Sequence, residues 1–123
     1  VPCTKTKNYN DKSIVKFAFN EKNEVTNMTR TDKFFEKKSK FLYKQVDIIS
    51  FKPKKLKLFS ELKRTYNEKK NNIELLRAID NNLKIKTFIV NTDSFSINTK
   101  KDYLKAKKFL NSKNGKKKFE IIK

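Results

Sequence analysis

Large aromatic rings carry much of the apolar content of this sequence, and they limit what it can fold into. Apolar residues make up only 36% of the 123 residues, but 11 Phe and 4 Tyr are among them. Because each buried ring removes a large apolar area from water, the chain can build one modest core. At this length the sequence predicts one domain, with at most a tail attached.

The beginning of the chain shows little hydrophobic periodicity. Pro2, Asn8, Asn10 and Asp11 all fall within its first 12 residues. This composition is typical of an extended or flexible segment. The sequence therefore predicts a flexible basic N-terminal arm over 1–12 and a single domain over 13–123.

Strands are predicted where β-branched and aromatic residues cluster or alternate with polar ones. The predicted ranges are 14–19, 46–51, 55–59, 84–90, 94–97 and 118–122. Helices are predicted over 31–44, 60–83 and 99–110. A strand is an open alternative in the first helical range, and Asn71-Asn72 and Asn81-Asn82 are possible breaks in the second. Thr99 and Asp102 have capping-box spacing in the third. Asn114-Gly115 supplies a helix stop with positive φ.

This order of elements predicts a compact α+β fold. The predicted architecture is a small antiparallel or mixed sheet with two to three helices packed on one face. No stretch approaches the ~20 apolar residues of a membrane span, so no transmembrane segment is expected. The start at Val1, without Met, fits a removed targeting peptide, an incompletely resolved start or secretion.

Rare residue types exclude many enzyme classes. The chain has no His, so catalytic sites that pair Ser or Cys with His are ruled out. Gly115 is the only glycine, which argues against the glycine-rich loops that hold nucleotide phosphates. Cys3 is the only cysteine, so no intrachain disulfide or zinc knuckle is expected. The sequence predicts no cofactor, no metal, no small-molecule substrate and no enzyme activity.

One enzyme class survives these exclusions, the metal-dependent nuclease that uses carboxylates and a lysine. Glu36 and Glu68 each stand two residues before a lysine. Such matches arise by chance in a chain this rich in lysine, so this remains a minor alternative.

Positive charge dominates the sequence and predicts the partner. Lys and Arg number 32 against 13 Asp and Glu, a formal net charge of +19. The charge falls into two acid-poor clusters, which favour contacts with phosphates. The predicted nucleic-acid-binding residues are Lys52, Lys54, Lys55, Lys57 and Arg64 in the first cluster, and Lys105, Lys107, Lys108, Lys113, Lys116, Lys117 and Lys118 in the second. Lysines outnumber arginines 29 to 3, which favours recognition of shape and backbone over base readout.

The composition is rich in Lys, Asn, Phe and Ile, whose codons are AT-rich, and it resembles that of organellar ribosomal proteins. Lys57-Leu58-Phe59-Ser60 and the later Lys117-Lys118-Phe119-Glu120-Ile121 are similar to segments of the tenth small-subunit ribosomal protein family. The resemblance implies a structural rRNA-binding protein of a mitochondrial or other organellar ribosome, with neighbouring proteins of a large assembly as further partners. The alternative is a secreted cationic protein that binds a polyanion such as a glycosaminoglycan, an acidic host protein or a membrane surface.

Overall fold

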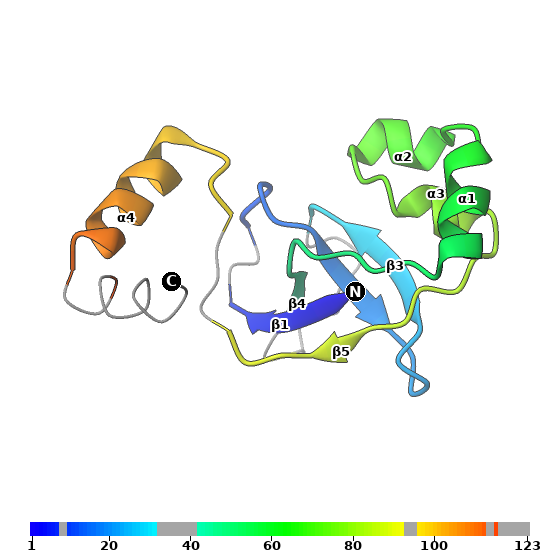
Figure 1. The fold of residues 1–123 in the computed structure, drawn as a ribbon, viewed down its shortest axis with the longest axis horizontal. Coiled ribbons are helices and arrows are strands. Elements are labelled where there is room, and N and C mark those ends of the chain that lie inside the picture. The colour runs from blue at the N-terminus through cyan, green and yellow to red at the C-terminus, as the bar shows by residue number, and fades with distance from the viewer. Residues whose placement is uncertain (8–9, 32–41, 93–95, 113–114, 116–123) are drawn as a thin grey trace. The chain divides into compact units, whose positions relative to one another are not determined.

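The computed structural model describes residues 1–7, 10–31, 42–92, 96–112 and 115. The chain divides into two compact units, Val1–Thr92 and Asp93–Lys123. Among the residues described, the first unit holds the sheet and three helices, and the second holds one named helix (Figure 1).

The sheet of the first unit has five strands in the order β3-β2-β4-β1-β5. Their bounds are Pro2–Thr6 for β1, Lys16–Phe19 for β2, Val25–Thr29 for β3, Leu42–Gln45 for β4 and Phe88–Ile89 for β5. β5 runs parallel to β1, and all other neighbours are antiparallel. The sheet is therefore mixed, and the predicted α+β fold class is confirmed.

Strand β1 lies where the sequence predicts a flexible arm. It pairs with β4 from Cys3 opposite Gln45 to Thr6 opposite Leu42, and with β5 on its other side. Four of its five residues are buried, including Thr4. A strand that is buried on both faces does not show the alternation of apolar and polar residues by which strands are predicted. Its threonines are polar, so the segment was predicted to be a loop. This explains why the composition of the segment did not reveal it.

A hairpin joins β2 to β3, and only its first strand was predicted. Asn20 shapes the turn, because its side-chain oxygen accepts hydrogen bonds from the amides of Lys22 and Glu24, both 3.0 Å long. Asn23 adopts a left-handed conformation with φ of 56°. Asparagine tolerates this conformation better than most residues, so the turn needs no glycine.

Three short helices follow β4: α1 (Pro53–Glu61), α2 (Tyr66–Asn71) and α3 (Leu76–Asp80). The predicted strand over 55–59 is wrong, because this segment lies within α1. Pro53 stands at the start of α1, where a missing amide hydrogen costs nothing, so it begins the helix rather than interrupting a strand. The helix predicted over 60–83 is not continuous. Both predicted breaks occur, because Asn72 ends α2 with φ of 51° and Asn81 follows the last residue of α3. The chain is also extended at Leu62, so no helix starts at Ser60.

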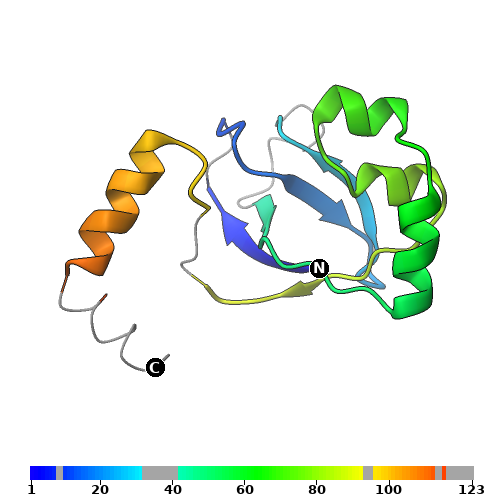
Figure 2. The same ribbon diagram turned by 45° about the horizontal axis from the view of Figure 1, so that its top comes forward.

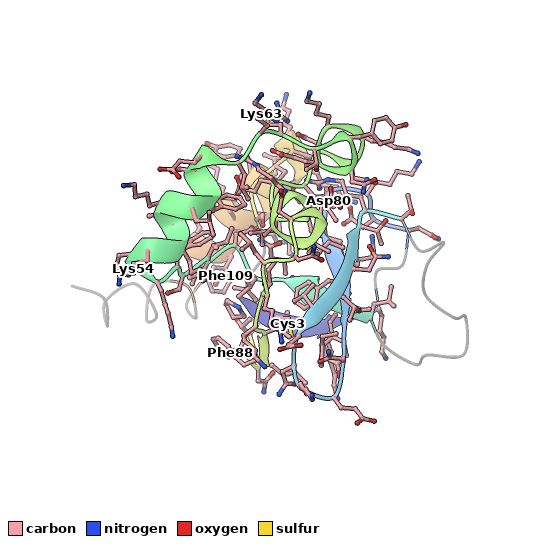
Figure 3. All side chains as sticks on the ribbon, turned by 90° about the vertical axis from the view of Figure 1, so that its right-hand side faces the viewer. Cys3, Lys54, Lys63, Asp80, Phe88 and Phe109 are labelled. Atoms are coloured by element: carbon pink, nitrogen blue, oxygen red, sulfur yellow. The ribbon has the colours of Figure 1, made fainter. Side chains whose placement is uncertain are left out.

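The core of the first unit lies between the sheet and the segment that leads into α3. Its buried members are Cys3, Phe17, Val25, Met28, Ile73, Leu75 and Leu76. All three helices lie together at one side of the sheet, near β2 and β3 (Figures 1 and 2). Cys3 lies inside this unit, as Figure 3 shows, and is fully buried.

Other predicted elements had mixed outcomes. The strand predicted over 84–90 shrinks to the two residues of β5, and no strand is assigned over 46–51. Most of 31–44, part of 94–97, Asn114 and all of 118–122 lie outside the described residues. Gly115 is described and does not have positive φ, in contrast to the predicted stop.

The helix of the second unit is confirmed. α4 spans Lys100–Leu110, and Thr99 and Asp102 form the predicted capping box. No helix in the described part of the chain is long and apolar enough to cross a membrane.

Candidate functional site

A polar pocket of about 490 Å³ opens in the first unit, where the ends of β2, β3 and β4 meet α2 and α3. Its walls come from segments far apart in the sequence. The lining residues are Val15, Arg30, Gln45, Asp47, Arg64, Glu68, Asn72, Ile73, Glu74, Leu75 and Arg77.

All three arginines of the chain line this pocket. Lysines outnumber arginines 29 to 3, so cationic side chains drawn at random from this chain would be mostly lysines. Arginine differs from lysine in its planar fork of donors, which holds two acceptors at fixed geometry. The pocket is therefore the one place where this chain uses that geometry.

Glu68 is held between two of the arginines. Its side chain is only 3% exposed. Arg77 donates from Nε to Oε2 and from Nη2 to Oε1, both at 2.9 Å, and Arg64 donates from Nε to Oε1 at 3.1 Å. Burial by itself raises the pKa of Glu68, but the hydrogen bonds and charges of Arg77 and Arg64 outweigh it, so the pKa is lowered. Glu68 is therefore an anion that orders the pocket wall.

Arg77 also links the helices. Its Nη1 donates to the carbonyl oxygen of Leu62 at 3.2 Å, and its guanidinium carbon lies 4.7 Å from the centre of the Phe59 ring. With the two hydrogen bonds to Glu68, all three of its nitrogens are engaged, through three of its five N–H groups. Arg77 is thus a structural group of the pocket rather than an open ligand site.

Arg30 ties three segments together at the other wall. Its guanidinium donates to the carbonyl oxygens of Lys12 and Ser13 before β2, and to those of Asn71 and Asn72 at the end of α2. A carbonyl oxygen accepts hydrogen bonds without cancelling the positive charge. Arg30 therefore keeps its charge at the pocket while it fixes the wall.

Three polar side chains of the pocket have hydrogen-bonding atoms that are available to a ligand. Within the described part of the chain, no hydrogen bond is recorded for the terminal nitrogens of Arg64, the carboxylate of Glu74 or the side-chain amide of Gln45. Arg64 has a side chain that is 56% exposed. The pocket thus offers a guanidinium, a carboxylate and an amide that are available to a polar ligand.

The predicted nucleic-acid-binding residues do not gather at this site. Arg64 alone among them lines the pocket. Lys52 occupies the N-cap position of α1 without a capping hydrogen bond from its side chain, and Lys54, Lys55 and Lys57 are exposed on that helix. Figure 3 shows Lys54 projecting from α1. Lys105, Lys107 and Lys108 are exposed on α4 of the second unit, and Lys113, Lys116, Lys117 and Lys118 lie outside the described residues.

The structure gives no support to the nuclease alternative. Glu68 faces Arg64 and Arg77, and Glu36 lies outside the described residues. The described residues contain no group of three or more His, Cys, Asp or Glu that could hold a metal ion.

Sequence reasoning missed the pocket, although one signal was present. The scarcity of arginine was interpreted as evidence on the mode of RNA binding, and Arg64 was named only as a phosphate contact. The more useful observation is that three arginines persist in a chain that otherwise uses lysine, at positions 30, 64 and 77. Their convergence depends on tertiary contacts across as many as 42 residues of sequence, and no local pattern encodes it.

The described fold matches that of a nucleotide-using enzyme. A solved structure of CMP:2-keto-3-deoxy-manno-octonic acid synthetase complexed with CTP superposes on 89% of this chain with a TM-score of 0.78. The two sequences are 19% identical, and the match covers 47% of that protein. This likeness shows that the chain has the same fold as part of the synthetase.

Sequence comparison also finds similarity to cytidylyltransferases of this kind. The chain is 32% identical over 108 residues to the 3-deoxy-manno-octulosonate cytidylyltransferase of Thermodesulfovibrio yellowstonii, a match that covers 81% of this chain and 42% of that protein. It is 41% identical over 69 residues to the enzyme of the same name from Rickettsia canadensis, covering 56% of this chain and 28% of that protein. The chain thus spans less than half the length of the curated relatives it matches. No family model matches it.

These comparisons overturn the functional predictions made from composition. The resemblance to organellar ribosomal proteins is wrong, and so are the rRNA-binding function and the secreted polyanion-binding alternative, because the relatives are bacterial cytidylyltransferases. The predictions of no enzyme activity and no small-molecule substrate are contradicted by the same relatives and by the CTP complex. Mitochondrial and secreted locations are contradicted as well.

The reason for the error is physical. Net charge governs solubility and nonspecific attraction, and it carries no information on fold or chemistry. The argument from a single glycine was also too broad. The scarcity of glycine argues against a phosphate-binding loop only in this sequence. The relative from Thermodesulfovibrio yellowstonii has more than half of its length outside the matched part, and the argument says nothing about those residues.

Proposed function

We propose that this chain acts in cytidylyl transfer to an acidic sugar, as the part that binds the sugar acid. The observation that carries the proposal is the 32% identity over 108 residues to a 3-deoxy-manno-octulosonate cytidylyltransferase. The shared fold with a CTP-bound CMP:2-keto-3-deoxy-manno-octonic acid synthetase supports it.

The chemistry of the pocket favours the sugar acid over the nucleotide. Triphosphates are commonly held by backbone amides of a glycine-rich loop, and Gly115 is the only glycine here. An octulosonate instead presents one carboxylate and several hydroxyls. The terminal nitrogens of Arg64 suit the carboxylate, and the side chains of Glu74 and Gln45 suit the hydroxyls.

In the proposed reaction, a hydroxyl oxygen of the sugar acid attacks the α-phosphorus of CTP. A bond forms between that oxygen and the phosphorus, the bond to the bridging oxygen breaks, diphosphate leaves, and the hydroxyl proton passes to solvent. The contribution of this chain is to hold the sugar acid in one orientation, which lowers the entropic cost of the encounter. Because CTP is made in the cytoplasm, we expect the protein to act there.

Binding of 3-deoxy-manno-octulosonate to the 123-residue chain tests the proposal. We expect saturable changes in the NMR signals of Arg64, Glu74 and Gln45. The methyl ester of the same sugar should bind at least about tenfold more weakly, because a hydrogen bond to a charged group is worth ~1.5–3 kcal/mol. Absence of binding, or equal binding of the ester, would contradict the proposal.

Two neighbouring residues provide matched variants. Arg64→Gln removes the guanidinium from the pocket and should weaken binding of the sugar acid, whereas Lys63→Gln removes an equal charge outside the lining and should not. Figure 3 shows Lys63 projecting from the segment that follows α1. Unfolding temperatures of both variants separate lost binding from lost folding.

A further inference from the structure

The charges that line the pocket cancel, although those of the whole chain do not. Six charged side chains line it, three of each sign: Arg30, Arg64, Arg77, Asp47, Glu68 and Glu74. The whole chain has a formal net charge of +19 and 29 lysines, yet no lysine of the described residues is in the lining. The pocket therefore differs in charge from the chain as a whole.

One of the negative charges is not compensated by a partner. Glu68 forms ion pairs with Arg77 at 2.9 Å and with Arg64 at 3.1 Å. For the carboxylate of Glu74, no hydrogen bond or ion pair is recorded within the described part of the chain. A ligand that enters the pocket therefore meets the negative charge of Glu74 as well as the guanidinium of Arg64.

The backbone of Glu74 is anchored in the core. Its neighbours Ile73 and Leu75 are 4% and 2% exposed. Its carbonyl oxygen accepts a hydrogen bond from the amide of Arg77 at 3.1 Å. Because both sides of this position are buried, backbone movement cannot carry the carboxylate away from the pocket.

A fixed carboxylate discriminates between anions by their charge. The carboxylate of a sugar acid carries one negative charge, whereas a phosphate ester carries about 1.5 to 2 at neutral pH. Coulombic repulsion from Glu74 increases in proportion to the charge of the ligand. The hydroxyls of a sugar acid, in contrast, can donate hydrogen bonds to Glu74. Repulsion of unwanted ligands is a general route to specificity.

We infer that Glu74, together with Asp47, makes the pocket select a sugar acid with a single negative charge and reject phosphorylated compounds. This inference rests on the proposed function and extends it to the ligands that the pocket excludes. The proposed reaction contains two other anions, CTP and diphosphate, and a chain with a net charge of +19 attracts both. The carboxylates keep these polyanions out of the space that the sugar acid occupies.

The experiment compares two ligands that differ only in a phosphate: 3-deoxy-manno-octulosonate, and the same sugar acid phosphorylated at its terminal hydroxyl. Binding is followed by NMR at the side-chain amide of Gln45, which lines the pocket, so that loose binding elsewhere on the cationic surface is not counted. We expect the unmodified chain to bind the unphosphorylated acid at least about tenfold more tightly, since the second anionic group is repelled.

Glu74→Gln should reduce this preference at least about fivefold. The variant keeps a side-chain oxygen that accepts from a hydroxyl, but it removes a negative charge, which changes the binding constant of a nearby anion severalfold even in water. Asp47→Asn should change the preference in the same direction and decides the question if Glu74→Gln does not fold. Glu21→Gln removes the same charge from the exposed turn between β2 and β3, outside the lining, and should leave the preference unchanged.

Diphosphate provides a measurement that does not depend on the sugar acid. At the Gln45 amide, it should bind the Glu74→Gln variant at least about fivefold more tightly than the unmodified chain. An unchanged preference in both pocket variants, an equal change in Glu21→Gln, or no gain in diphosphate affinity would overturn the inference.

These outcomes are distinct from failure of the proposed function. If the sugar acid binds but the variants do not alter the preference, the inference fails while the proposed function stands. If the sugar acid does not bind, the proposed function fails, and the diphosphate measurement alone decides whether Glu74 repels polyanions.

Discussion

At the scale of single residues, the pocket depends on one carboxylate. Glu68 accepts three hydrogen bonds from Arg77 and Arg64 and is almost fully buried. Without this carboxylate, the two guanidinium groups would repel each other across the same small volume. An ordered arginine with free terminal nitrogens is what a carboxylate ligand needs, so Glu68 prepares the site even though it offers no free oxygen to the ligand.

This arrangement predicts a specific pH dependence. The pKa of Glu68 is lowered on folding, so its stabilisation is fully present above the ordinary pKa of glutamate and is lost as pH falls through the lowered value. Glu68→Gln should reduce stability at neutral pH and flatten the decline in the free energy of unfolding below about pH 4.3. Urea unfolding between neutral and acidic pH measures both effects.

The control is Glu74→Gln, at an exposed carboxylate on the same pocket without a recorded partner in the described chain. It should leave stability and its pH dependence unchanged. Equal slopes in the Glu68 variant and the unmodified protein would show that the ion pairs do not stabilise the fold.

At the scale of elements, local signals succeeded where the bonds themselves were local. The capping box of α4 uses atoms only three residues apart: the amide of Asp102 donates to Thr99 Oγ1 at 3.2 Å, and the amide of Thr99 donates to Asp102 Oδ2 at 2.9 Å. None of the residues of α4 is buried. Its helical state therefore depends on these end contacts more than on packing.

Removal of this cap should have a measurable effect. Thr99→Ala should destabilise α4 by about 1 kcal/mol, since it removes the side-chain acceptor at the N-cap. Faster amide exchange in the first turn of α4 would report the loss. Lys101→Ala, at an exposed position of the same helix, should not accelerate exchange, and an equal effect of both variants would argue against the cap.

At the scale of the whole molecule, charge remains the dominant property, although it does not identify the function. A formal net charge of +19 on 123 residues makes the folded state repel itself. Few acids offset this repulsion. Among them, Glu24 lies 3.3 Å from the Nζ of Lys84 and 3.2 Å from that of Lys86.

Added salt should therefore stabilise the protein. Raising sodium chloride from low to physiological concentration and above shortens the Debye length from about 30 Å to below 8 Å and screens the repulsion. We expect the midpoint of thermal unfolding to rise by several degrees, with most of the rise at low salt. A midpoint that falls steadily with salt would mean that the ion pairs outweigh the net repulsion.

The sequence by itself determined the features that depend on neighbours in the chain. These are the α+β class, the first strand of the hairpin, and the α4 helix with its capping box at Thr99 and Asp102. Each rests on propensity, alternation or hydrogen bonds within a few residues. Composition could not reveal function, because lysine on an exposed helix reports charge and not chemistry.

Only the tertiary structure decided where the special residues meet. It placed Thr4 inside a sheet, ended α1 at the extended residue Leu62, and brought Arg30, Arg64 and Arg77 to one pocket. Each outcome depends on partners far along the chain, such as the 42 residues between Arg30 and Asn72. Burial and pairing at such separations depend on the packing of the whole core, which no local window contains.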